Sequence, residues 1–137
     1  MTTSPFVVLI HQSNLDTLFH AASVAVASAA SGRATYIVLF LAALKDWMDD
    51  AEWNVRAKPL LSGTQQVPSV EFLGTSGSSP RQMLEETRPL GLKIYACSGS
   101  VELLDLSRAE VLQKVDDIIG LPALFRKIGP NASIVSY

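Results

Sequence analysis

Three short apolar runs, each followed by a stretch with helical features, constrain the fold more than any other feature of this sequence. The runs cover 5–10 (PFVVLI), 34–40 (ATYIVLF) and 92–97 (LKIYAC). Continuous apolar runs of this length are typical of central strands in a parallel sheet, because helices cover both faces of such a sheet. Strands that alternate with helices predict right-handed βαβ units and therefore an α/β domain.

The segments between and after these runs predict the helices. An alanine-rich stretch over 15–30 has small residues on most faces, which predicts a helix buried between the sheet and another element. Ser13 or Asn14 can cap its N-terminus, and Gly32 ends it. The same signals predict helices over 41–50, 80–90, 101–106, 108 to 118 or 119, and 121–128, and a last strand over 131–137.

The length of 137 residues fits a single domain over 1–137 with its own hydrophobic core. Between about 51 and 78 the pattern is lost, and many Pro, Gly, Ser and Thr residues predict a long irregular insertion. Within it, 74–79 (GTSGSS) has the composition of an anion-binding loop but lacks the Gly-Lys-Ser/Thr ending of a phosphate-binding loop. We interpret it as a lead into the next helix, and a short element near 67–73 is an open alternative.

Composition and charge exclude several classes of protein. The formal net charge of -2 leaves no basic surface for a nucleic-acid backbone, so we expect no nucleic-acid partner. The most hydrophobic stretch, 36–44, is far shorter than the roughly 20 residues of a membrane span. The start of the chain lacks a basic leader, and we expect a cytoplasmic protein. A hydrophobic fraction of 48% and a mean hydropathy of +0.26 favour apolar surface buried in a homo-oligomer.

Cys97 is the only cysteine, and its place at the end of a predicted strand makes it the main candidate for chemistry. A single cysteine excludes an internal disulfide and a multi-cysteine metal site within one chain. Ligands of open parallel sheets bind beyond the carboxyl ends of the strands. The sequence leaves two interpretations of Cys97 open, a reactive thiol and a small buried hydrophobic residue.

The residues around Cys97 favour a sulfur anion. Ser98, Gly99 and Ser100 lead into a helix, whose N-terminal N–H groups and partial positive charge stabilise a thiolate or a persulfide. Gly99 allows a tight turn, and the two serines add hydroxyl donors. His11, after the first strand, is a candidate acid–base helper of Cys97, and the alternative is a strand-end residue that hydrogen-bonds the backbone.

The second histidine and the tryptophans are interpreted as structural. His20 lies inside the alanine-rich helix, and a metal site made of His11, His20 and Cys97 would need a convergence that the spacing does not support. We therefore expect no metal ion and no cofactor. Trp47 and Trp53 are interpreted as core residues or subunit contacts.

The segment 84–100 (LEETRPLGLKIYACSGS) has the order helix, Gly-apolar-Lys-apolar-x-Ala-Cys-x-x-Ser, helix. It resembles the DsrE-like family of sulfur-relay proteins, as do the segment 101–107 and the strand–helix–strand pattern of the first 45 residues. The resemblance implies a three-layer α/β/α fold with a mainly parallel sheet of four to five strands, and commonly an oligomer. It also implies that Cys97 accepts and donates persulfide sulfur.

These observations predict a sulfur carrier or sulfurtransferase that holds sulfane sulfur as a persulfide on Cys97. Its expected partners are sulfur donor and acceptor proteins or small thiols. The alternative is a non-catalytic DsrE-like subunit, or a small-ligand-binding module that uses 74–79, with a structural cysteine. The two differ in whether Cys97 of the native protein reacts with a thiol reagent.

Overall fold

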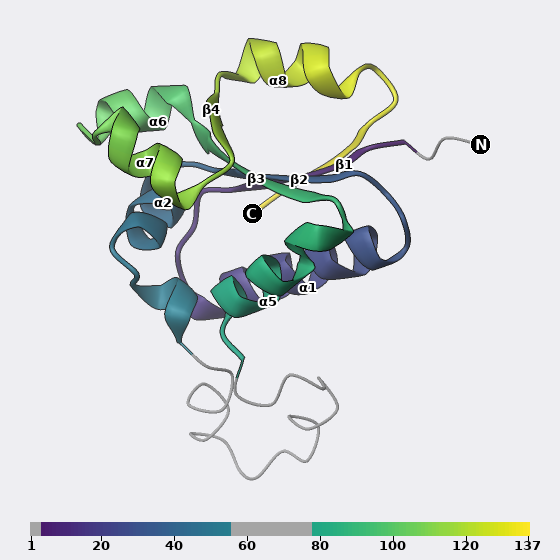
Figure 1. Cartoon of the computed structure of the whole chain (residues 1–137), viewed down its shortest axis with the longest axis horizontal. Coiled ribbons are helices and arrows are strands. Elements are labelled where there is room, and N and C mark those ends of the chain that lie inside the picture. The colour runs from purple at the N-terminus through teal and green to yellow at the C-terminus, as the bar shows by residue number, and fades with distance from the viewer. Residues whose placement is uncertain (1–3, 56–77) are drawn as a thin grey trace, which may run out of the picture.

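A computed structural model describes residues 4–55 and 78–137, and this part of the chain contains five strands in one sheet with helices on both faces (Figure 1). Residues 74–77 of the predicted 74–79 loop, the possible short element near 67–73 and most of the 51–78 insertion lie outside the described residues. In chain order, the elements are β1 (Phe6–Ile10), α1 (Leu15–Ala30), β2 (Thr35–Leu39), α2 (Leu41–Met48), η1 (Glu52–Asn54), α5 (Pro80–Thr87), η2 (Arg88–Leu90), β3 (Leu92–Cys97), α6 (Ser98–Leu103), α7 (Arg108–Lys114), β4 (Asp117–Ile119), α8 (Leu121–Ile128) and β5 (Ser133–Ser136).

The strands lie in the order β4-β3-β2-β1-β5, and each neighbouring pair is parallel. The register places Ile37 of β2 beside Val8 of β1 and Ile94 of β3. Helices α1 and α5 cover one face of the sheet and α8 covers the other (Figure 1). The predicted three-layer α/β/α fold with a parallel sheet is confirmed.

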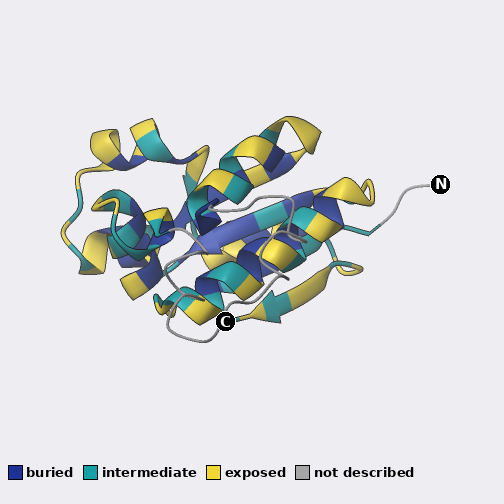
Figure 2. Ribbon diagram, turned by 90° about the horizontal axis from the view of Figure 1, so that it is seen from below, coloured by how far each residue is buried: buried dark blue, intermediate teal, exposed yellow. Residues whose placement is uncertain are grey.

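The larger core lies between the sheet and helix α1. Ala21, Ala22 and Ala25 of α1 are fully buried, and their small side chains allow close approach of the sheet on one side and α5 on the other. The predicted position of this helix is therefore confirmed. Figure 2 shows buried residues along the central strands and exposed residues on the outer faces of the helices. Trp47 and Trp53 are also fully buried, with their rings edge to face 5.2 Å apart.

The smaller core lies on the opposite face of the sheet, under α8. Its buried members come from the three central strands and from α8, and they are Val7, Val38, Tyr95, Cys97, Leu124 and Ile128. Within the described residues, α8 is the helix whose buried side chains belong to this cluster. Phe125 of α8 and Ile134 of β5 remain 50% and 44% exposed. The described residues therefore cover this face only in part.

The predicted helix from 108 to 118 or 119 is wrong in its second half. Helix α7 ends at Lys114, and Asp117–Ile119 forms the edge strand β4. Backbone pairing with β3 explains the change, because the Asp116 N–H donates to the Ile94 carbonyl and the Asp116 carboxylate accepts from the Ile94 N–H. The β-branched residues around it also suit a strand.

Two other predicted helices have different bounds. Helix α6 begins directly after Cys97 instead of at residue 101, so the predicted turn belongs to the helix. The predicted helix over 80–90 divides into α5 and the 3-10 turn η2, which contains Pro89. Gly91 ends this segment with φ of 101°, a left-handed conformation that favours glycine. No helix in the described ranges combines the length and the hydropathy of a membrane span.

Candidate functional site

Cys97 lies at the carboxyl end of β3, between the neighbouring strands β2 and β4. Its side chain is 8% exposed and belongs to the smaller core under α8. The next residue, Ser98, begins α6. The only cysteine is therefore at a strand-to-helix junction on the edge of the sheet where ligands of open parallel sheets bind.

Gly99 is an immediate neighbour of the sulfur. A Cβ atom added at Gly99 would lie 3.9 Å from Cys97 Sγ, so the sulfur lies beside the first turn of α6. Backbone N–H groups in the first turn of a helix have no partner four residues earlier, and the helix dipole places partial positive charge there. The stabilisation of a sulfur anion by this turn stays a prediction.

Ser98 and Ser100 connect the first turn of α6 to the two neighbouring junctions. Ser100 is 4% exposed, and its Oγ accepts a hydrogen bond of 3.1 Å from the Leu41 N–H at the start of α2. Ser98 Oγ would lie only 3.2 Å from a Cβ atom at Gly120, at the start of α8. Both predicted hydroxyl donors thus lie close to Cys97 in the chain, and their role in stabilising a sulfur anion stays a prediction.

His11 lies on the same edge of the sheet, but β2 separates its strand from that of Cys97. Two strand spacings place the two backbones roughly 9–10 Å apart. The exposed His11 uses its backbone N–H to bind the Tyr137 carbonyl and its carbonyl to accept from the Ala43 N–H. Within 4–55 and 78–137, no hydrogen bond joins His11 to Cys97, and its role as a helper stays a prediction.

Leu41 and Leu121 are features of this edge that sequence analysis did not single out. Leu41 follows β2, is 42% exposed and has φ of 46°, which is uncommon for a residue other than glycine. Leu121 follows β4 and is 39% exposed. The sequence does contain a pattern that could have identified them, because a leucine begins the helix after β2 and the helix after β4. Only the strand order shows that these two strands are the neighbours of β3.

Tyr95 is a titratable group that shares the smaller core with Cys97, and Tyr36 packs against the same core. Burial raises the pKa of Tyr95 above its ordinary value, and the charge of Lys127 opposes this effect. The ring of Tyr36 stacks on Tyr95 with centroids 5.8 Å apart. The phenol is therefore neutral near pH 7. In the described part of the chain, no three His, Cys, Asp or Glu side chains converge as metal ligands.

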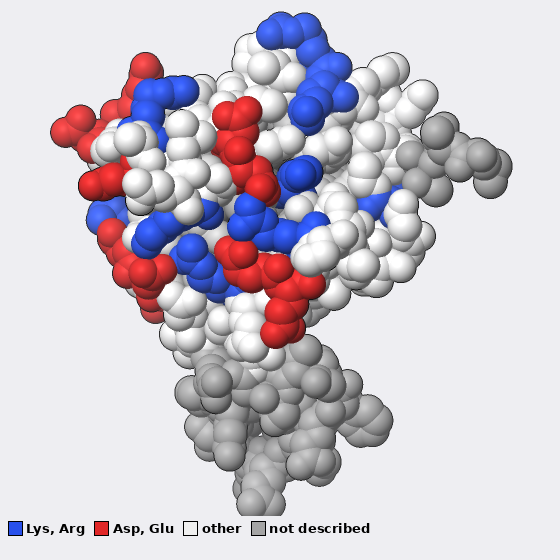
Figure 3. All heavy atoms as spheres, in the orientation of Figure 1, with Lys and Arg blue, Asp and Glu red and all other residues white. Residues whose placement is uncertain are grey.

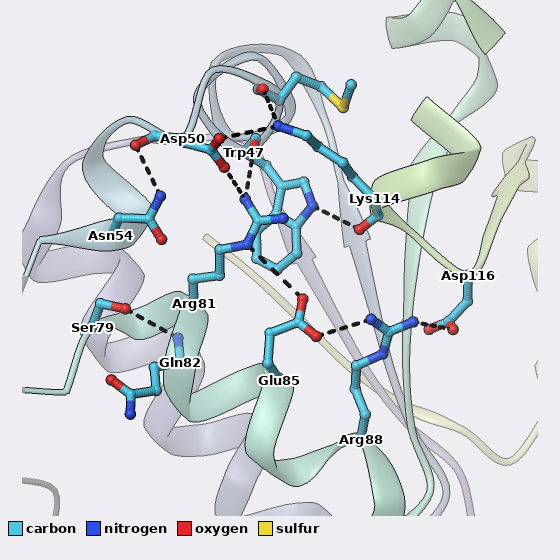
Figure 4. A network of polar contacts seen from close by, with 11 residues as sticks. Trp47, Asp50, Asn54, Ser79, Arg81, Gln82, Glu85, Arg88, Lys114 and Asp116 are labelled. Carbon is cyan, nitrogen blue, oxygen red and sulfur yellow. Dashed lines mark hydrogen bonds and ion pairs between the residues drawn. The ribbon is translucent and has the colours of Figure 1, made fainter. Parts of the chain in front are cut away.

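A separate polar network lies away from Cys97, where α2, α5 and α7 meet (Figure 4). The Arg81 guanidinium lies 4.0 Å from the Trp47 ring centroid and binds the Trp47 carbonyl and the Asp50 carboxylate. Lys114 binds the Met48 carbonyl at 2.7 Å and Asp50 at 3.2 Å. Figure 3 shows acidic and basic side chains interleaved on this face of the molecule. Because each charge drawn in Figure 4 has a partner of opposite sign, the network is structural.

Two solved structures resemble this chain over almost its whole length. One is the protein of unknown function MTH1491 from Methanobacterium thermoautotrophicum, with a TM-score of 0.61 and 13% identity over 98% of this chain and 100% of that chain. The other is the ychN protein from E. coli, with a TM-score of 0.61 and 15% identity over the same shares. No family pattern and no curated protein sequence matches. The chain thus has a YchN/DsrE-type fold.

Proposed function

We propose that this chain is a sulfur carrier or sulfurtransferase, which holds sulfane sulfur as a persulfide on Cys97. The observation that supports the proposal is the position of the sulfur beside Gly99, in the first turn of α6 and at the carboxyl edge of a parallel sheet. The shared fold and the Ala-Cys-x-x-Ser motif are consistent with it.

The chemistry requires only the cysteine and two thiol partners. The Cys97 thiolate attacks the outer sulfur of a donor persulfide, R–S–SH, and an S–S bond forms as the bond to the donor sulfur breaks. The products are the Cys97 persulfide and the donor thiolate, R–S⁻, which leaves with the electron pair. An acceptor thiolate then attacks the outer sulfur of the Cys97 persulfide, and the Cys97 thiolate leaves. Neither transfer has a net oxidation.

The chain supplies electrostatic support for these anions. The free N–H groups of α6 and the hydroxyl groups of Ser98 and Ser100 lie within three residues of Cys97. Because Ser100 Oγ accepts from Leu41, its own proton is free to donate. His11 would exchange a proton with Cys97 indirectly, through solvent or through a group of the partner, because β2 lies between their strands.

The proposal extends to partners and compartment. Donor and acceptor proteins or small thiols would exchange sulfur with Cys97 without a cofactor. A homo-oligomer would cover the partly exposed sheet face under α8, where Phe125 and Ile134 are exposed. A reducing cytoplasm would keep the lone thiol available.

The experiment is intact-mass spectrometry of the native protein after brief incubation with polysulfide or thiosulfate. We expect a gain of about 32 Da per added sulfur, reversed by a reductant. The Cys97→Ser variant should show no gain. The second candidate function is a non-catalytic subunit with a structural cysteine, and the 8% exposure of Cys97 is consistent with it. This candidate holds if the wild-type protein takes up no sulfur and Cys97 reacts with a thiol reagent only after unfolding.

A further inference from the structure

Two exposed surfaces of this chain carry apolar side chains together with opposite charges. The residues of the α8 surface are Leu121, Phe125, Arg126 and Lys127. The residues of the α6–α7 surface are Glu102, Leu103, Asp105, Arg108, Glu110 and Leu112. We infer that the α8 surface of one copy of this chain binds the α6–α7 surface of a second copy. This contact rests on the homo-oligomer of the proposed function, and it does not depend on the sulfur chemistry of Cys97.

Helix α8 buries only one of its sides against the sheet. Leu121 and Phe125 lie one helical turn apart and therefore on the same side of α8. They remain 39% and 50% exposed, and the exposed Arg126 and Lys127 follow directly. Because α8 contains no acidic residue, the α8 surface is apolar and positively charged.

Helices α6 and α7 leave two other leucines in solvent. Leu103 ends α6 and is 75% exposed, and Leu112 of α7 is 46% exposed. Large exposed apolar patches commonly mark interaction sites. The charged residues of this surface are also exposed, and carboxylates outnumber cations among Glu102, Asp105, Arg108 and Glu110. The α6–α7 surface is therefore apolar and negatively charged.

The charges of the two surfaces do not pair within the described part of one chain. Every ion pair within residues 4–55 and 78–137 lies outside both surfaces. Figure 3 shows Lys and Arg side chains over α8 and several Asp and Glu side chains over α6 and α7. The two surfaces therefore neutralise each other when two copies meet, and such complementarity favours one partner and one orientation.

The same charges disfavour the other ways in which two copies could meet. Two α8 surfaces in contact would bring cations together, and two α6–α7 surfaces would bring carboxylates together. The carboxylate of Asp50 is no alternative partner for α8, because it already pairs with Arg81 and Lys114 of its own chain. Among these surfaces, the α6–α7 surface is thus the one that fits α8 in both polarity and charge.

Each copy has one surface of each kind, which determines the symmetry that the contact allows. Unlike surfaces either close a ring of copies or form two equivalent contacts between two copies. In both cases the leucines and Phe125 supply the apolar area removed from water, and the flanking charges select the partner.

The test reverses the charge of one surface at a time and measures self-association by sedimentation velocity over a concentration series. Removal of one charge at the rim of an interface changes affinity little, so each variant reverses two charges. The α8 variant is Arg126→Glu with Lys127→Glu, and the α6–α7 variant is Glu102→Lys with Glu110→Lys. We expect each variant alone to associate at least about tenfold more weakly than the wild-type protein, because like charges then face each other.

The decisive measurement is the equimolar mixture of the two variants. In the mixture, the negative α8 surface of one variant meets the positive α6–α7 surface of the other, and the second contact is of the wild-type kind. Association should therefore return to within about threefold of the wild-type affinity. The combined variant with all four substitutions should also associate by itself, which shows in addition that the substitutions leave the fold intact.

Asp49→Lys with Glu86→Lys is the matched control for the α6–α7 variant. Both carboxylates are exposed and lie outside the two surfaces, and the change in net charge is the same. This control should associate as the wild-type protein does. Circular dichroism and thermal melts establish that each variant is folded.

The outcomes separate this contact from the rest of the proposed function. If the wild-type protein associates but the folded variants associate equally well, or their mixture does not recover, the homo-oligomer holds and this contact is wrong. If the wild-type protein is monomeric at micromolar concentration, the contact and the homo-oligomer are both wrong. Sulfur uptake by Cys97, measured by mass, is decided separately from either result.

Discussion

Gly91 and Gly99 lie at the two ends of β3 and have different reasons to be glycine. Gly91 has φ of 101°, and no atom lies within 4 Å of a Cβ added there, so its constraint is conformational and not steric. Gly99 lies in the first turn of α6, and an added Cβ would contact Cys97 Sγ at an ordinary distance of 3.9 Å. The same substitution should therefore have opposite effects at the two positions.

We expect Gly91→Ala to destabilise the protein by about 1–2 kcal/mol, because an L-residue with a side chain is strained in this backbone conformation. Urea unfolding of the variant and the wild-type protein measures the difference in the free energy of unfolding. Gly91→Asn, which tolerates positive φ, should recover part of the loss. An alanine variant with wild-type stability would contradict the conformational argument.

Gly99→Ala should leave the fold intact and raise the free energy of unfolding by about 0.4–1 kcal/mol, because alanine restricts the unfolded chain and suits a helix. The added methyl group stands beside Cys97 Sγ, so the native thiol should react more slowly with a maleimide. Stopped-flow labelling measures this rate. A faster reaction, or a loss of stability, would show that the sulfur does not lie where the structure places it.

At the scale of elements, α2 is held at its C-terminal end by two other helices. The Trp47 and Met48 carbonyls accept hydrogen bonds from Arg81 of α5 and Lys114 of α7 (Figure 4). Cations are favourable at helix C-termini because they bind the free carbonyls and oppose the helix dipole. Asp50 follows this end and pairs with both cations.

Arg81→Ala should lower the free energy of unfolding by about 1–3 kcal/mol, because it removes the contact with the Trp47 ring and the hydrogen bond to the Trp47 carbonyl. Chemical denaturation measures the loss. Arg126→Ala, at an exposed arginine of α8, is the control and should change stability by at most about 0.5 kcal/mol. Equal effects of the two substitutions would argue against a role for Arg81 in anchoring α2.

The hydrogen bond from Lys114 lowers the pKa of Asp50. A lowered folded-state pKa means that the contribution to stability is present above the unfolded pKa of about 4 and is lost as pH falls through the folded value. Asp50→Asn should therefore be less stable than the wild-type protein at about pH 7, and the difference should shrink by about pH 3. Urea unfolding at both pH values measures it, and a difference independent of pH would be the contrary result.

At the scale of the whole molecule, the two faces of the sheet differ in how well residues 4–55 and 78–137 cover them. Helices α1 and α5 bury one face, whereas α8, with eight residues, covers the other within the described part of the chain (Figure 1). Phe125 and Ile134 leave large apolar side chains exposed on this second face. Large exposed apolar patches in soluble proteins commonly mark interaction sites.

We expect the wild-type protein to self-associate through the α8 face. The Phe125→Glu variant should be folded but form a smaller species in solution, because an unpaired carboxylate buried in the interface opposes association. Sedimentation velocity measures both. Leu90→Glu is the control, since Leu90 is 60% exposed in η2, beyond the α5 layer. A monomeric wild-type protein at micromolar concentration would remove this role for the face.

The strands β1, β2 and β3, the helix α1 and the position of Cys97 were predictable from the sequence, because their signals are local. A run of five or six apolar residues forms a central strand wherever both of its faces are covered. Asn14 caps the N-terminus of α1, because its side chain accepts a hydrogen bond from the Thr17 N–H. The same local rules placed Cys97 at a strand end directly before a helix.

The tertiary structure alone decided how these elements meet. Segment 117–119 has apolar residues that suit a helix or a strand, and pairing of Asp116 with Ile94 makes it a strand. The strand order places β2 between the strands that end at His11 and Cys97, and it places β2 and β4 on either side of β3. These outcomes depend on hydrogen bonds and contacts between residues far apart in the chain. Local sequence therefore determined which segments form the sheet and where its cysteine lies, and long-range pairing decided which side chains surround that cysteine.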